Sequence, residues 1–209
     1  MFWVLLGIAA VAVGVLVWGE WRTSPVRFAA KPIASVAFIV AGVDRGAFDS
    51  NYGRVLFVGL VLAALGDVFL LGSTRLMFLA GLVSFLLGHV AYVLAFLTLG
   101  ADIWWVAGGF VLVAALAMLI LRWLRPHLDP DMTTPVLAYV AVISLMVVVA
   151  TGVVGNGATP WILVGAIGFF ASDLAVARNQ FVTESITNRA WGLPLYYASQ
   201  FVLAWTVGI

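Results

Sequence analysis

The chain has 209 residues; 65% are hydrophobic, only 9% are charged, and the mean hydropathy is +1.17. A soluble domain carries about a quarter of its residues as charged side chains, so the surface of this chain must face lipid. A net charge of +1 argues against a nucleic-acid partner, because that binding relies on clustered Lys and Arg. Cysteine is absent, which excludes disulfides, thiol nucleophiles and cysteine metal sites.

Apolar runs of about 17–22 residues recur along the chain, and each is long enough to cross a hydrocarbon core of about 30 Å as a helix. The first run, Met1 to Trp18, has no basic leader and no small-x-small cleavage site, which indicates a retained helix rather than a signal peptide. We therefore expect an all-α integral membrane protein with one domain, residues 1–209, built as a bundle of eight transmembrane helices. They are predicted near residues 2–18, 28–43, 54–72, 77–99, 103–122, 135–152, 160–178 and 190–208.

Basic residues predict the orientation of the bundle. The loops after the odd-numbered runs hold Arg22, Arg27, Arg75, Arg122, Arg125, Arg178 and Arg189, with Lys31 close by. The opposite loops hold only Arg45 and Arg54. The positive-inside rule therefore places the odd-to-even loops in the cytoplasm and both termini outside, and we expect the plasma membrane of a bacterium.

Small residues and an internal correspondence suggest how the helices pack. Gly7/Gly14, Gly59/Gly66 and Gly81/Gly88 are each seven apart on one helix face, a spacing that lets neighbouring backbones approach. Pro32 and Pro135 both open a predicted even-numbered span and lie 103 apart, and Asp67 and Asp173 both lie late in an odd-numbered span, 106 apart. Two parallel four-helix repeats would explain this match, although proline is common in a first helical turn.

Asp67 and Asp173 are the unusual residues of the apolar runs. An Asp at a helix centre costs about 2.5–3.5 kcal/mol on insertion scales, so each needs a buried partner or a task. Their distance from the helix ends places both roughly 7–10 Å below the cytoplasmic boundary. Each could pair with a nearby arginine and lock two helices together, or the two could form a functional site.

Other polar residues lie near these spans. His89 is predicted about two turns deeper than Asp67, as a hydrogen-bonded core residue or a functional one. Lys31 could snorkel to the surface or pair with an aspartate, and Tyr197 and Gln200 share a helix face with donors for a carboxylate. The chain has two histidines, so no three-histidine or HExxH metal site can be built, and we expect no metal or other cofactor.

The order and spacing of several short motifs resemble the YhhN family of membrane proteins, which includes the animal lysoplasmalogenases. The motifs are Lys31-Pro32, Gly66-Asp67-Val68-Phe69-Leu70-Leu71, Phe78-x-x-Gly81-x-x-x-Phe85-x-x-Gly88-His89-x-x-Tyr92, Ser172-Asp173-Leu174 and Tyr196-Tyr197-x-x-Gln200. The resemblance implies eight transmembrane helices and hydrolysis of the vinyl ether bond of lysoplasmalogens to a fatty aldehyde and a glycerophospho-alcohol. It also implies that Asp67 and Asp173 are the catalytic pair.

The residues fit that chemistry. Enol ethers are hydrolysed by protonation of the vinyl carbon and capture of the resulting oxocarbenium ion by water, and two carboxyl groups that share one proton can supply the acid and stabilise the cation. The substrate would be a lysophospholipid drawn from the membrane. Residues expected to bind it are Lys31, Arg75, His89, Tyr92, Arg178, Tyr196, Tyr197 and Gln200, with the two arginines at the phosphate. The alternatives are a proton-coupled transporter of small molecules or lipids and a purely structural membrane protein.

Overall fold

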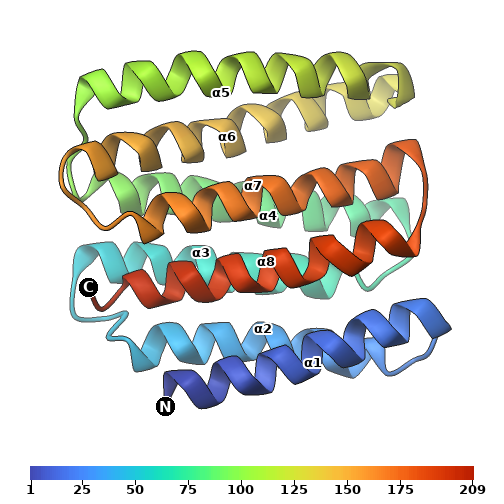
Figure 1. Ribbon diagram of the computed structural model, residues 1–209. Coiled ribbons are helices and arrows are strands. Elements are labelled where there is room, and N and C mark those ends of the chain that lie inside the picture. The colour runs from blue at the N-terminus through green and yellow to red at the C-terminus, as the bar shows by residue number, and fades with distance from the viewer.

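The computed structural model describes residues 1–209 and is built from helices alone, which confirms the predicted all-α class (Figure 1). Eight α-helices are joined by short loops, with a 3-10 turn after α5 and a π-helical segment after α7. Their bounds are α1 (Phe2–Arg22), α2 (Arg27–Asp44), α3 (Asn51–Phe69), α4 (Arg75–Leu97), α5 (Ile103–Leu124), the 3-10 turn Arg125–His127, α6 (Pro130–Gly155), α7 (Trp161–Ala177), the π-helix Arg178–Val182 and α8 (Ile186–Thr206).

Six of these helices, α1 and α3 to α7, are long and apolar enough to cross a membrane. The protein is therefore a multi-pass membrane protein. The other two, α2 and α8, are the least apolar of the eight because they carry polar side chains along their length. Most of these side chains are buried among the helices instead of facing outward, as Lys31, Ser35 and Gln200 show.

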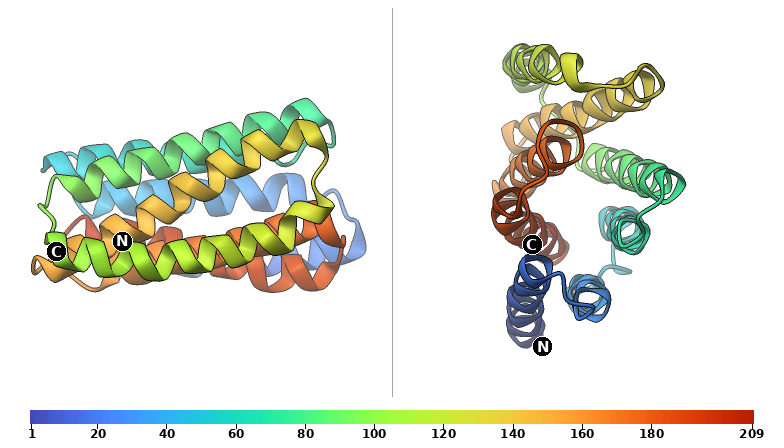
Figure 2. Two further views of the ribbon diagram at one scale, coloured as in Figure 1. Left: turned by 90° about the horizontal axis from the view of Figure 1, so that it is seen from above. Right: turned by 90° about the vertical axis from the view of Figure 1, so that its right-hand side faces the viewer.

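Seven helices form a ring. Neighbours pack in the order α1, α2, α3, α4, α6, α7 and α8, and α8 closes the ring by packing on α1 and α2 (Figure 2). Helix α5 lies outside this ring and packs mainly on α6. Both termini lie at one end of the bundle, and the loops that follow α1, α3, α5 and α7 lie at the other, which we call the basic end because it holds most of the arginines (Figure 1).

Polar residues begin several of the helices. Ser50 accepts a hydrogen bond from the backbone N–H of Gly53 at 3.0 Å, and Thr74 accepts one from Met77 at 3.2 Å. Asp102 accepts from the N–H groups of Trp104 and Trp105. These caps satisfy amide groups that the first turn of a helix leaves without partners, so the chain turns and re-enters the bundle at these residues.

The predicted spans agree with the helices to within five residues at each end, with one systematic difference. Pro32 and Pro135 were expected to open their helices, yet α2 and α6 begin five residues earlier, at Arg27 and Pro130. The expectation was wrong because it placed each proline in the first turn of its helix, where backbone N–H groups have no partner within the helix and a missing one has no cost. Inside the helix each proline leaves the carbonyl four residues before it without its usual partner.

Glycines bring α3 and α4 together. A Cβ atom added to Gly59 would overlap the ring of Tyr92, and one added to Gly66 would lie 2.7 Å from Phe85. The prediction from glycine spacing is therefore confirmed for this helix pair. It is wrong for Gly7 and Gly14 on α1, because an added Cβ there meets no atom within 4 Å.

We expect Gly59→Ala to lower the thermal unfolding midpoint in detergent, because the new methyl group must displace Tyr92. Overpacking of this kind costs about 1–3 kcal/mol. Gly7→Ala is the matched control, which should be neutral or slightly stabilising because the helix gains intrinsic propensity and meets no neighbour. Equal midpoints for the two variants would contradict the close α3–α4 packing.

Candidate active site

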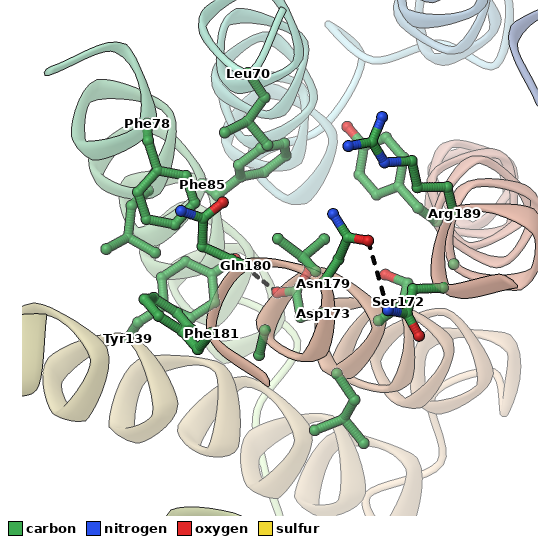
Figure 3. A pocket seen from close by; sticks show the side chains of 18 of the residues that line it. Leu70, Phe78, Phe85, Tyr139, Ser172, Asp173, Asn179, Gln180, Phe181 and Arg189 are labelled. Carbon is green, nitrogen blue, oxygen red and sulfur yellow. Dashed lines mark hydrogen bonds between the residues drawn. The ribbon is translucent and has the colours of Figure 1, made fainter. Parts of the chain in front are cut away.

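A cavity of about 1000 Å³ enters the bundle from the basic end. We call it the chamber. Residues of all eight helices line it, with α5 contributing only Ile120 and Leu124 near its end, together with the loops after α3, α5 and α7 (Figure 3). Charged and amide side chains lie at its mouth, apolar and aromatic side chains cover its inner wall, and both Asp67 and Asp173 lie on that wall.

Asp67, in the last turn of α3, is buried and saturated with donors. Its Oδ2 accepts hydrogen bonds from the Ser35 hydroxyl at 2.7 Å and the Tyr196 hydroxyl at 2.8 Å, and the Tyr197 hydroxyl lies 3.4 Å away. Its Oδ1 lies 3.3 Å from the Lys31 ammonium, so Lys31 pairs with the aspartate instead of snorkelling. A cation and several hydroxyl donors around one carboxyl group stabilise its ionised form.

Asp173 on α7 has a different environment. Its Oδ2 accepts a hydrogen bond from the Tyr139 hydroxyl of α6 at 2.6 Å, and the Nε2 of His89 lies 3.8 Å away (Figure 3). Neither ring nitrogen of the fully buried His89 has a hydrogen-bond partner. No lysine or arginine pairs with Asp173, so its surroundings contain no permanent cation.

The two carboxyl groups are held apart by their partners. No hydrogen bond joins Asp67 to Asp173, so the expected direct sharing of one proton is absent. The reason is that each is bound by its own set of helices: α2 and α8 surround Asp67, whereas α4 and α6 surround Asp173. What they share is the chamber, whose wall includes both.

His89 lies closer to the aspartates than its sequence position suggested. The prediction placed it about two turns deeper than Asp67. In the structure its ring lies beside Asp173. The prediction counted the depth of Asp173 from Arg178, but the helix continues beyond Arg178 as the π-helix Arg178–Val182. Asp173 therefore lies deeper below the basic end than that count implied.

The mouth of the chamber carries charges of both signs. Arg189 binds Glu20, and also Glu184 at 2.7 Å, while Arg27 lies 3.4 Å from Glu20. Arg75 also lines the mouth and pairs with an exposed aspartate of α6, Asp131.

Arg178 does not reach the chamber, although it was expected at the phosphate. It is absent from the chamber wall, since it lies five residues after Asp173 and is therefore turned about 140° around the helix axis from it. Arg27 and Arg189 occupy the mouth in its place.

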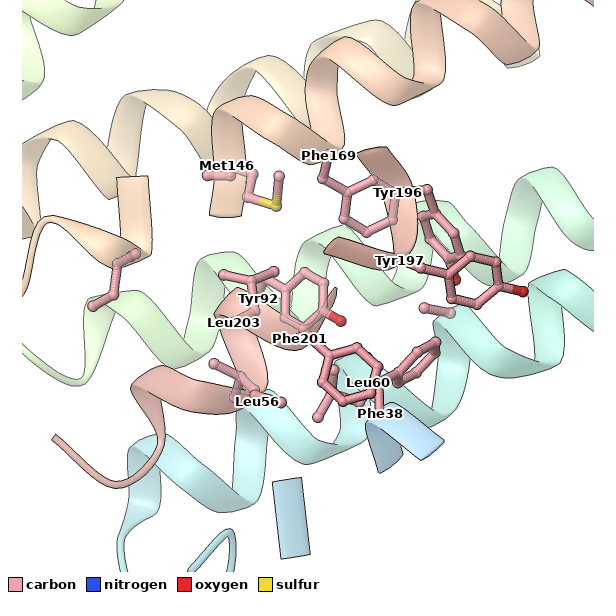
Figure 4. Close-up of a cluster of buried hydrophobic side chains, with 14 of the residues drawn as sticks. Phe38, Leu56, Leu60, Tyr92, Met146, Phe169, Tyr196, Tyr197, Phe201 and Leu203 are labelled. Carbon is pink, nitrogen blue, oxygen red and sulfur yellow. The ribbon is translucent and has the colours of Figure 1, made fainter. Parts of the chain in front are cut away.

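Four of the residues expected to bind substrate, His89, Tyr92, Tyr197 and Gln200, are buried and absent from the chamber wall. His89 and Tyr197 lie beside the aspartates, whereas Tyr92 and Gln200 lie in the core. The Tyr92 hydroxyl donates to the Oε1 of Gln200 at 2.6 Å, which links α4 to α8 away from the chamber wall. Tyr92 packs there with a cluster of large apolar side chains that includes Phe169 and Phe201 (Figure 4). This hydrogen bond satisfies the Tyr92 hydroxyl and the Gln200 side-chain oxygen, whereas the buried Nε2 of Gln200 has no hydrogen-bond partner.

Ser35 and Tyr139 were not predicted from the sequence. Both hydroxyls bind a site carboxylate, and both lie alone in apolar stretches of helix, where a single hydroxyl attracts little notice. The available signal was the helical register: Ser35 follows Lys31 by one turn and therefore shares its face.

Comparisons with known proteins show the family of the chain. The model of the YhhN family matches residues 26–207. A protein of Mycobacterium bovis named lysoplasmalogenase is 29% identical over 209 residues, covering 94% of this chain and 78% of that protein. The human protein named lysoplasmalogenase TMEM86A is 34% identical over 155 residues, covering 71% of this chain and 63% of that protein. No solved structure matches the chain.

The family match covers every helix of the ring except α1, and it includes both aspartates, the helices that hold them and all of the chamber wall except Leu16 and Glu20. The chain belongs to the YhhN family.

Proposed function

We propose that this protein is a membrane-embedded hydrolase that cleaves the vinyl ether bond of lysoplasmalogen-type lysolipids. The observation that carries the proposal is the presence of two differently held aspartates on the wall of one chamber, in a chain similar to proteins named lysoplasmalogenase. Because those relatives are named as enzymes, the comparisons do not favour a proton-coupled transporter.

Asp173 suits the role of general acid. Burying a carboxyl group without a cationic partner costs less when it is protonated, and a protonated carboxyl can deliver its hydrogen to the vinyl carbon. Tyr139 holds the Oδ2 of Asp173, and the side chain keeps a small exposed fraction, 16%, with which to meet a substrate in the chamber.

Asp67 suits the role of stabilising the cation that protonation produces. Protonation of the vinyl carbon leaves a positive charge shared by the ether oxygen and its neighbouring carbon, and an ionised carboxylate on the same wall stabilises that charge. Water then adds to the cationic carbon, and the hemiacetal collapses to a fatty aldehyde and a glycerophospho-alcohol. The proton lost by the water restores the acid, so the protein is unchanged after each turnover.

The chamber suits a lysophospholipid in shape and polarity. Its mouth at the basic end carries Arg27, Arg75 and Arg189 beside Glu20 and Glu184, so a zwitterionic headgroup could exchange ion pairs with both signs of charge. The apolar inner wall would receive the chain, and the ether linkage between them would lie at the level of the aspartates.

All eight helices are inferred to cross the membrane as a single domain. Apolar content alone qualifies six, but the polar residues of α2 and α8 are largely turned into the ring and leave mainly apolar side chains outside. The distribution of arginines supports a cytoplasmic basic end with both termini outside. The membrane we propose is the plasma membrane of a bacterium.

The geometry also supports two parallel repeats of four helices. Asp67 of α3 is held by Ser35 of α2 and Tyr196 of α8, and Asp173 of α7 is approached in the same way by Tyr139 of α6 and His89 of α4. The corresponding positions lie 104 to 107 residues apart, close to the spacing of the aspartates themselves.

Single cysteines should reveal the topology, because the chain has none of its own. Thr23 and Asp49 lie on either side of α2, and Thr183 and Ile209 lie on either side of α8. We expect Thr23→Cys and Thr183→Cys to react with a membrane-impermeant maleimide from the cytoplasmic side, and Asp49→Cys and Ile209→Cys to react from the outer side. Labelling of both residues that flank one helix from the same side would show that this helix does not span.

Asp173→Asn should abolish aldehyde release from a vinyl-ether lysolipid, with a fall in kcat of about 100-fold or more, and leave the unfolding midpoint nearly unchanged. Asp67→Asn should also abolish activity but destabilise the protein by about 3–5 kcal/mol, since Lys31 is left buried without its counterion.

The double variant Asp67→Asn/Lys31→Met separates these effects. It should recover much of the stability lost in Asp67→Asn and still release no aldehyde, because removing the buried charge does not replace the carboxylate. Normal turnover in Asp173→Asn or in the double variant would refute the two-carboxyl mechanism.

Tyr139→Phe should lower kcat about tenfold and leave KM nearly unchanged, because it removes the hydrogen bond that positions Asp173 without touching the mouth of the chamber. Tyr52→Phe is a matched control: that buried hydroxyl lies 2.6 Å from Thr206 at the far end of the bundle. A rise in KM with unchanged kcat in Tyr139→Phe would assign it to substrate binding instead.

A further inference from the structure

A second cavity, which we call the lateral groove, lies between α5, α6 and α7. Its volume is about 630 Å³, and its wall comes from the first half of α5, the last two turns of α6 and the first half of α7. Helix α5 lies outside the ring (Figure 2), and several of its groove residues are exposed, Leu112 the most among the aliphatic ones at 74%. In a membrane this groove therefore communicates with the surrounding lipid.

The groove offers almost nothing to a polar ligand. Glycine, leucine, valine, isoleucine and phenylalanine make up most of its wall, and two indole rings, Trp104 and Trp105, lie at its far end. The one hydroxyl, on Thr151, already donates to the carbonyl of Val147 at 2.9 Å. Hydrocarbon is the chemistry that this surface recognises.

The groove adjoins the chamber across the side of α7. The two share one residue, the buried Phe170 of α7, whose side chain contributes to both walls. On α5 and α6 the last residue on the wall of one cavity and the first on the wall of the other are about one turn apart: Ile120 and Leu116 on α5, and Ile143 and Val147 on α6. Phe170 therefore separates the two cavities, and a movement of its side chain would join them into one path.

The dimensions of this path match a lipid chain. Asp173 and Leu163 are ten residues apart on α7, about 15 Å along the axis, which is the depth of one leaflet of a hydrocarbon core of about 30 Å. A chain that begins at the vinyl ether beside Asp173 and extends away from the basic end would pass Phe170 and end in the groove.

We propose that the lateral groove binds the far half of the substrate's aliphatic chain and releases the fatty aldehyde sideways into the bilayer. This inference rests on the proposed hydrolysis for its substrate. The glycerophospho-alcohol, which is polar, would leave through the mouth at the basic end, so the two products would separate into lipid and water.

Gly108 provides a way to fill the groove without disturbing the bundle. It lies on the groove wall, and a Cβ atom added there meets no atom within 4 Å. We expect Gly108→Trp to lower kcat/KM for a hexadecenyl lysolipid about tenfold or more and to leave an octenyl lysolipid nearly unaffected, because only the longer chain is displaced from the aspartates. Gly108→Leu should give a smaller effect in the same direction.

Gly7→Trp on the outer face of α1 is the matched control. Gly7 also has open space around its Cβ position and lines neither cavity, so this variant should hydrolyse both lysolipids at the normal rate. An equal loss with both chain lengths in Gly108→Trp, or no loss with either, would overturn the groove as the binding site for the chain.

A binding experiment separates this inference from the proposed function. The probe is a saturated-ether lysolipid, which cannot be hydrolysed, with a diazirine at the end of its chain. Irradiation should label Leu112 or Ile167 in the wild type and in Asp173→Asn, and Gly108→Trp should lose this labelling. Labels confined to the chamber, or removed equally by an excess of ordinary diacyl phospholipid, would overturn the inference whatever the activity measurements show.

Discussion

The buried ion pair between Lys31 and Asp67 is the interaction that holds the whole site together. Both side chains are almost fully enclosed, with Lys31 7% and Asp67 2% exposed, and each would be prohibitively costly in this position alone. Satisfying them requires α2, α3 and α8 to meet at one point, because the hydroxyls that complete the shell come from Ser35 and Tyr196. The closure of the ring and the shape of the chamber follow from that junction.

The two aspartates show how one scaffold produces two different carboxyl groups. Asp67 lies on α3 and Asp173 on α7, the third helix of each proposed repeat. Asp67 has a lysine and several hydroxyls around it, whereas Asp173 has a tyrosine and an unpartnered histidine. Acid catalysis followed by stabilisation of a cation needs such unequal partners more than it needs a direct contact between them. Separation also leaves room for the substrate bond.

The bilayer explains why polarity is distributed as it is. In a soluble protein the polar faces of α2 and α8 would turn outward, whereas here the solvent is hydrocarbon and the polar faces turn into the ring. The chamber brings water-compatible surface to the depth of the aspartates from one side, and the lateral groove brings lipid-compatible surface from the other. In the proposed mechanism, the vinyl ether of a lysolipid would lie at the boundary between these two kinds of surface.

The helices and the two aspartates could be predicted from the order of residues alone. Each apolar run must be a helix to satisfy its backbone in lipid, and a charge inside such a run is costly enough to be noticed, so the helix bounds and the positions of Asp67 and Asp173 were accessible. Ser35 and Tyr139 were not, because a hydroxyl in a transmembrane run is cheap and common. The contact between His89 and Asp173 joins helices far apart in the chain, and no local pattern encodes it.

Which helices line the chamber and which face lipid became clear from the packing in three dimensions. The spans of α5 and α6 have nearly equal hydropathy, 2.3 and 2.5, but the first is 17% buried and the second 56%. Lipid tails are as apolar as a protein core, so composition carries no information about whether a helix lies inside the ring or outside it. Side-chain packing makes that choice, together with the need to surround each buried carboxyl group with donors.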